Sequence, residues 1–168
     1  MKLFKLILFI CLGLALMAGF TAAGDKTAPE LERLKQLVGS WKAVDPEGKA
    51  VAITYKLASS DNSLMETLDT EGKKQSMVTM YHLDNDKVMM THYCSLGNQP
   101  RMRVDKSNKD PNKLSFKFVD GTNFRSKDDM HMHRLVFTFK DKDHFTQEWF
   151  LRDKGKESPV VFNFERAN

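Results

Sequence analysis

The sequence is poor in cysteine, with two residues among 168, Cys11 and Cys94. Cys11 lies in an apolar N-terminal segment that we expect to be removed, so Cys94 would be the single thiol of the mature chain. One thiol cannot form an internal disulfide, whatever the redox compartment. The fold must therefore rest on a hydrophobic core, and the length suits one domain that can bury such a core.

The sequence also lacks the common catalytic motifs. It contains no P-loop, no dinucleotide-binding glycine motif, no G-x-S-x-G nucleophile elbow and no H-E-x-x-H. Cys94 and His92 have the residue types of a nucleophile and its base. Side chains two positions apart on a strand do not normally touch, however. We expect a binding protein rather than an enzyme and assign no catalytic residue.

Charge of one sign is not in large excess. The formal charge of the whole chain is +4, and removal of the N-terminal segment, which carries Lys2 and Lys5 and no acidic residue, would lower it to +2. The remaining lysines alternate with aspartates, as in residues 106–110 and 140–143. This pattern is typical of solvated turns and not of a basic stripe, so we expect no nucleic-acid partner.

The longest apolar run, Leu6 to Met17, is shorter than the approximately 20 residues that a membrane-spanning helix requires. Two lysines precede the run, and the small residues of segment 21–24 follow it. This order is that of a secretory signal peptide. We predict that residues 1–23 are cleaved after Ala23 and that residues 24–168 are exported, to the periplasm or outside the cell, without a stable membrane anchor.

One helix is predicted before the first strand. Thr27 and Glu30 have the spacing of a capping box, in which each side chain satisfies a free amide of the first helical turn. Gly39 is the expected stop of this helix. Its apolar face comprises Leu31, Leu34, Leu37 and Val38.

From residue 40 onward, short alternating runs separated by Gly, Pro, Asn and Asp predict strands joined by tight turns. Sequential strands with such short links form a meander, and closing it into a barrel removes the exposed edges. The sequence therefore predicts an all-β fold, an antiparallel up-and-down β-barrel of about ten strands with one short N-terminal helix. The predicted strands are 40–44, 50–57, 63–68, 75–83, 87–94, 100–105, 113–119, 130–139, 144–152 and 158–166.

Alternation also predicts which side chains face the interior. In the strand at 130–139, the odd positions that hold Leu135 and Phe137 face inward, and the same parity directs His131 and His133 inward. Aromatic residues with a few polar groups are typical of a cavity that binds a small, largely apolar molecule. A small barrel can also fill its interior with its own side chains and act through its outer surface. The predicted cavity is lined by Tyr55, Phe116, Phe118, His131, His133, Phe137, Gln147 and Trp149.

The triplet Gly39-Ser40-Trp41 after a short helix, together with Arg166 near the C-terminus, resembles the signature of the lipocalin and fatty-acid-binding superfamily. The resemblance implies that Trp41 closes one end of the barrel and that Arg166 packs across it, so that Gly39, Trp41 and Arg166 are structural. The segments 91–94 and 97–102 also look like a stretch found in uncharacterised exported bacterial proteins.

Histidine offers an alternative function. Two imidazoles in His131-Met132-His133 share one face of a strand, and His92 and Cys94 have the same relation on another strand. Such a set could hold zinc, copper or heme if the two strands placed these side chains next to one another, at the same level of the barrel. The barrel methionines could be soft ligands for copper, or flexible packing residues. The leading interpretation requires no cofactor, and the alternative is a metal- or heme-binding barrel.

Overall fold

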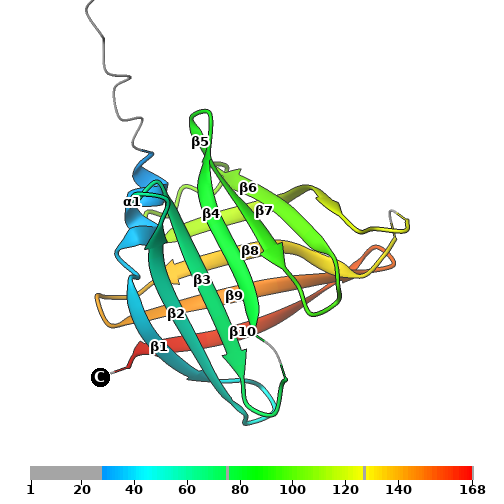
Figure 1. Cartoon of the computed structure of the whole chain (residues 1–168), viewed down its shortest axis with the longest axis horizontal. Helices are drawn as coiled ribbons and strands as arrows, with labels where there is room; N and C mark the ends of the chain where they lie inside the picture. Colours follow the sequence, from blue (N-terminus) through cyan, green and yellow to red (C-terminus); the bar gives the residue numbers. More distant parts are fainter. Residues whose placement is uncertain (1–27, 75, 127, 168) are drawn as a thin grey trace, which may run out of the picture.

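The computed structural model describes residues 28–74, 76–126 and 128–167 as one short helix and ten antiparallel strands (Figure 1). The helix is α1 (Pro29–Lys35). The strands are β1 (Gly39–Val44), β2 (Ala50–Ala58), β3 (Ser63–Thr70), β4 (Met77–Asp84), β5 (Lys87–Tyr93), β6 (Gln99–Asp105), β7 (Lys113–Thr122), β8 (His131–Phe139), β9 (His144–Asp153) and β10 (Lys156–Arg166).

The ten strands form a closed barrel in which each strand pairs with its neighbours in sequence and β1 pairs with β10. This confirms the predicted fold class. Every predicted strand is present, and its ends lie within three residues of the predicted ends. The predicted signal peptide lies outside the described residues, and no helix among the residues described has the length and apolar character to cross a membrane.

The helix differs from the prediction at both ends. Its N-cap residue is Ala28, which provides no side-chain hydrogen bond, so the predicted capping box is wrong; Thr27 lies outside the described residues. Glu30 instead forms an ion pair with Lys106 at 2.8 Å. The helix ends at Lys35, not at Gly39, which is the first residue of β1 and has a φ of +125°. A side chain at Gly39 would be strained, and its Cβ would lie 3.1 Å from Nη1 of Arg166.

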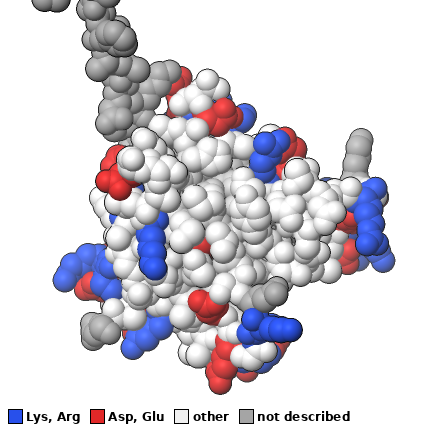
Figure 2. Space-filling model, in the orientation of Figure 1, with Lys and Arg blue, Asp and Glu red and all other residues white. Residues whose placement is uncertain are grey.

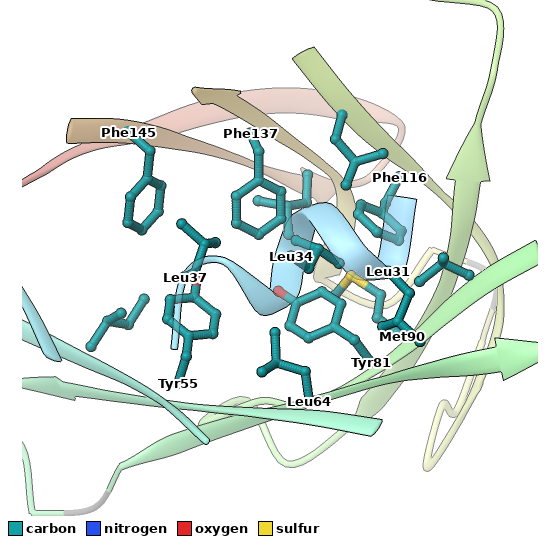
Figure 3. Packing of buried hydrophobic residues seen from close by; sticks show 14 of the residues in the cluster. Leu31, Leu34, Leu37, Tyr55, Leu64, Tyr81, Met90, Phe116, Phe137 and Phe145 are labelled. Atoms are coloured by element: carbon teal, nitrogen blue, oxygen red, sulfur yellow. The ribbon is translucent and has the colours of Figure 1, made fainter. Parts of the chain in front are cut away.

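Helix α1 lies across one end of the barrel (Figure 1). Its buried side chains and Leu37 join one hydrophobic cluster with the inward-facing residues of the strands. Figure 3 shows Leu31, Leu34 and Leu37 among the rings of Tyr81 and Phe137. The interior beneath the helix is therefore filled by the protein's own side chains.

Inward positions follow the predicted alternation in most strands, and Val51, Ile53 and Tyr55 are buried together on β2. Leu57 is an exception, because it lies one residue before the end of β2 and is exposed. On the outer surface, the face that Figure 2 shows carries its lysines, arginines and acidic residues mainly at the periphery. Few charged side chains lie over β3 to β5.

Candidate functional site

The barrel is closed, but the ladder between β1 and β10 is short and leaves an opening beyond its end. Only two residue pairs join these strands, Trp41 with Arg166 and Lys42 with Glu165. Beyond them, Ala43 and Val44 pair with β2 alone, and β10 pairs with β9 alone. We call this opening the β1/β10 seam.

The β1/β10 seam contains a groove of about 980 Å³. Its lining includes Val51 and Phe164, two buried members of the hydrophobic cluster, so the groove reaches inward-facing side chains. Val44 at its edge is 61% exposed. The charged residues that line it are balanced between lysines and acids: Lys42, Lys73 and Lys140 against Asp69, Glu71 and Glu165.

A second opening lies between β7 and β8, and we call it the β7/β8 seam. The ladder of these strands ends at the pair Lys117 and Arg134, although β7 continues to Thr122 along β6. A pocket of about 570 Å³ occupies this seam. It is lined by Phe118, Gly121, Phe124, Arg125, Ser126, His131, His133 and Arg152.

A chain of hydrogen bonds fixes the protonation of the two histidines in this pocket. The backbone carbonyl of Asp129 can only accept, so Nδ1 of His131 donates to it at 2.6 Å. At the other end, Arg152 can only donate, so Nε2 of His133 accepts from its Nη1 at 3.1 Å, and the proton of His133 lies on Nδ1, which donates to Nε2 of His131 at 3.0 Å. Burial and the neighbouring Arg152 lower the pKa of His133, which favours this neutral state.

A β-bulge contradicts the predicted orientation of His131. The register of β8 against β9 shifts between Met132 and Arg134, so His133 is an extra residue without a partner on β9. The shift reverses the alternation, and Met132 packs against the core while His131 shares the opposite face with Arg152. His131 is nevertheless buried, because Phe118 and Phe124 lie 4.5 and 5.1 Å from it between ring centroids.

Sequence reasoning missed a buried polar network around Glu66. Tyr55, Tyr81 and Gln147 donate hydrogen bonds to Oε2 of Glu66 at 2.7, 2.8 and 2.9 Å. Burial raises the pKa of Glu66, and these donors counteract the rise. Alternation could have identified this residue, because Glu66 lies between inward-facing Leu64 and Leu68 on β3.

His92 extends this network inside the barrel and does not lie at its rim. Its Nδ1 is 2.9 Å from Oγ1 of Thr79, and its ring lies 4.7 Å from that of Trp149 between centroids. Nε2 of His92 is buried without a hydrogen-bond partner among the described residues. Burial lowers the pKa of His92 to about 4, so the ring is neutral at pH 7.

The structure does not bring the predicted metal ligands together. No hydrogen bond or ring contact joins His92 or Cys94 to the pair His131 and His133 in the described ranges of the chain. In the same ranges, no group of three or more His, Cys, Asp or Glu side chains is arranged to hold a metal ion. Cys94 is buried, and burial raises the pKa of its thiol.

Comparisons with known proteins bear on the fold alone. No protein-family model matches the chain, and no curated protein matches it in sequence. A solved structure of a protein of unknown function from the DUF3598 family, from Nostoc punctiforme, is similar with a TM-score of 0.51 and 10% sequence identity. The similarity covers 80% of this chain and 49% of that protein, so this chain spans about half the length of the relative.

The eight residues predicted to line one cavity occupy two places. Phe118, His131 and His133 line the pocket of the β7/β8 seam. The other five are buried in the interior and contact one another or the Glu66 network: Tyr55, Phe116, Phe137, Gln147 and Trp149. None of the eight lines the β1/β10 groove.

The residues expected at the end of the barrel do meet there. The guanidinium of Arg166 lies 4.1 Å from the ring centroid of Trp41, and Nε1 of Trp41 donates to the carbonyl of Leu37 at 2.7 Å. Arg166 also donates to the carbonyls of Val38 and Lys142 at 3.2 and 3.1 Å. These contacts connect the last strand, the first strand and the segment after α1.

Proposed function

We propose that this protein binds a small, largely apolar molecule with a linear chain in the β1/β10 seam. The observation that carries the proposal is the groove of about 980 Å³, which continues from exposed Val44 to buried Val51 and Phe164. Pockets for small molecules usually have volumes of about 300–1,000 Å³. An exposed valine beside such a volume gives an apolar chain a surface to cover.

The charges around the groove support an apolar rather than an ionic mode of recognition. Lys42 forms an ion pair with Glu165 at 3.0 Å, and Lys140 donates to Oδ1 of Asn163 at 3.2 Å. These cations already have partners within the protein. Affinity would therefore come mainly from removing hydrocarbon from water, which is worth about 0.8 kcal/mol for each buried CH₂ group.

Export also belongs to this proposal. We infer from the signal-like residues 1–23 that the barrel binds its ligand outside the cytoplasm, with a lipocalin-like mode of action. The mass of the protein purified from its own host tests this inference. A mature chain that begins at Gly24 supports export, and an intact N-terminus contradicts it.

Titration calorimetry with 1-decanol, a neutral linear probe, tests the site. The variant Val44→Asp is expected to bind decanol at least tenfold more weakly, because a carboxylate would be desolvated against the chain. Val161→Asp is the matched control, since Val161 is 40% exposed on β10 and does not line the groove. Equal affinity of both variants, or no binding by the unmodified protein, would contradict the proposal.

A further inference from the structure

The two arginines of the β7/β8 pocket differ from most arginines of the barrel. Arg101, Arg103 and Arg134 form ion pairs with Asp120, Asp84 and Glu157, and Arg166 forms one with Asp143. Arg125 and Arg152 line the pocket, and neither has a carboxylate within 4.0 Å among the residues that the structure describes. Neither guanidinium of the pocket therefore has a direct ion pair among the described residues, although Oε1 of Glu157, the cross-strand partner of Arg152, lies 3.8 Å from Nε2 of His133.

The acidic residues near the pocket have partners within the protein. The carboxylate of Asp129 accepts hydrogen bonds from the backbone N–H of Arg125 at 2.6 Å and from Ser126 at 2.9 Å. Glu157 pairs with Arg134 through Oε2, and its Oε1 lies 3.8 Å from Nε2 of His133. No aspartate or glutamate belongs to the lining itself. The described lining residues therefore offer an anion two guanidinium groups and no carboxylate, and one oxygen of the neighbouring Glu157 is already paired with Arg134.

Arg152 is both oriented and available. A guanidinium has five N–H donors, and the contact with Nε2 of His133 uses one of them. Because Arg152 can only donate to Nε2 of His133 and the carbonyl of Asp129 can only accept from Nδ1 of His131, the donor direction along both imidazoles is fixed. The remaining donors of Arg152 have no partner in the described part of the chain. They suit a carboxylate, which a guanidinium binds through two parallel hydrogen bonds.

The other walls of the pocket are flat and apolar. Phe118 stacks on His133 with an interplanar angle of 25° and 5.2 Å between centroids, and Phe124 lies at 5.9 Å from Phe118. Gly121 makes this arrangement possible, because a Cβ there would overlap the ring of Phe124 and crowd the backbone of Gln99. Rings arranged in this way accept a planar ligand through offset stacking.

From these observations we propose that the β7/β8 pocket binds a planar aromatic carboxylate, with Arg152 holding the carboxylate and Phe118 and Phe124 contacting the ring. This site is separate from the β1/β10 groove and takes a different class of ligand. Arg125 is exposed at the edge of the pocket and adds charge that attracts the anion.

Calorimetry with 2-naphthoate and with 2-naphthylmethanol, a neutral molecule of similar shape, tests the proposal. The unmodified protein is expected to bind the carboxylate at least tenfold more tightly than the alcohol. Arg152→Gln should abolish this preference. Arg103→Gln is the matched control, because Arg103 pairs with Asp84 on β4 and does not line the pocket, so the preference should persist.

Two further measurements locate the site. Addition of 2-naphthoate should shift the imidazole NMR signals of His131 and His133, and Val44→Asp should leave the affinity for 2-naphthoate unchanged. If Arg152→Gln fails to fold, Phe124→Ala provides the second variant and should weaken the carboxylate and the alcohol alike. Equal affinity for the two ligands, an unchanged preference in folded Arg152→Gln, or loss of 2-naphthoate binding in Val44→Asp would overturn the proposal.

Discussion

The end of the barrel beneath α1 and the two seams differ in what their side chains contact. At the closed end, Trp41 is buried with its N–H bonded to a backbone carbonyl, and Arg166 covers it. At the seams, Val44 is 61% exposed, and the side chain of Arg152 has one hydrogen-bond partner among the described residues. The closed end therefore stabilises the fold, whereas the seams keep side chains accessible, as the two proposed binding sites require.

The completeness of strand pairing explains this difference. β2 pairs with β1 and β3 along most of its length, and its inward residues Ile53 and Tyr55 are fully buried. The ladder between β1 and β10 ends after two pairs, and that between β7 and β8 ends after five. Where a ladder ends, the neighbouring strands no longer cover the side chains, and a pocket can form.

The largest expected effect on stability is that of Trp41→Ala at the closed end. The substitution removes a fully buried ring that packs edge-on against Phe145 with 4.7 Å between centroids. Large-to-small changes of a buried aromatic residue cost about 3–5 kcal/mol of unfolding free energy. Urea denaturation followed by circular dichroism measures the loss. Val44→Ala at the seam is the control and should change stability by less than about 0.5 kcal/mol; similar losses in both variants would refute the comparison.

The pH dependence of stability distinguishes the interior from the seams. The pKa of His92 is about 4 in the folded protein, below its ordinary value of 6.5, because the ring is buried. Between these values the unfolded chain binds a proton at His92 and the folded chain does not, so stability falls as the pH falls. One pKa unit corresponds to about 1.4 kcal/mol, so the full effect from pH 6.5 to 4 is about 3 kcal/mol.

Glu66 has the opposite effect on the pH dependence of stability. Burial raises its pKa, so the folded protein binds a proton there more readily than the unfolded chain does. The His92 contribution is therefore measured as a difference between the unmodified protein and His92→Phe, which keeps a ring against Trp149. The stability advantage of the unmodified protein over this variant should fall by about 3 kcal/mol from pH 6.5 to 4. A constant difference would mean that His92 titrates normally in the folded protein. His133→Phe should show a smaller change, since the His133 side chain is 25% exposed.

Arg166→Lys is expected to have an intermediate effect at the closed end. Lysine keeps the charge, but it cannot place a planar group over Trp41 and donate to the carbonyls of Val38 and Lys142 together. We expect a loss of about 1–2 kcal/mol from one stacking contact and the lost hydrogen bonds. Arg101→Lys, in an exposed pair with Asp120, should cost less than about 0.5 kcal/mol. Equal losses would show that Arg166 contributes only charge.

The alternation of apolar and polar residues predicted the strands and the barrel, because each strand has one buried face. It predicted the inward positions of Phe116, Phe137 and Gln147 for the same reason. It failed at His131, because an extra residue at His133 reverses the alternation and no local pattern marks that bulge. On β6 the alternation is uninterrupted, because Arg101 and Arg103 form ion pairs on the outer face and Met102 and Val104 are buried.

The seams were beyond prediction for a different reason. Pairing between β1 and β10 joins segments of the chain that are more than 100 residues apart. The alternation of buried and exposed residues in each strand continues past the point where pairing stops, so it does not mark that point. The sequence also could not show that the eight predicted cavity residues lie in two places, the β7/β8 pocket and the filled interior. Helix α1 and its leucines fill the interior that Phe116 and Phe137 would otherwise have left to a ligand.

The smallest expected effect on stability is that of Arg152→Gln at the β7/β8 seam. The lost partner of Arg152 is Nε2 of His133, a half-buried acceptor that water can reach, so stability should change by less than about 0.5 kcal/mol. The pKa of His133 should rise, because the charge of Arg152 is one of the causes that lower it. Imidazole NMR titration measures this rise, and Arg103→Gln should leave the pKa of His133 unchanged. An unaltered titration of His133 in folded Arg152→Gln would show that the guanidinium does not act on this imidazole, and the seam would then lack the oriented arginine that distinguishes it from the closed end.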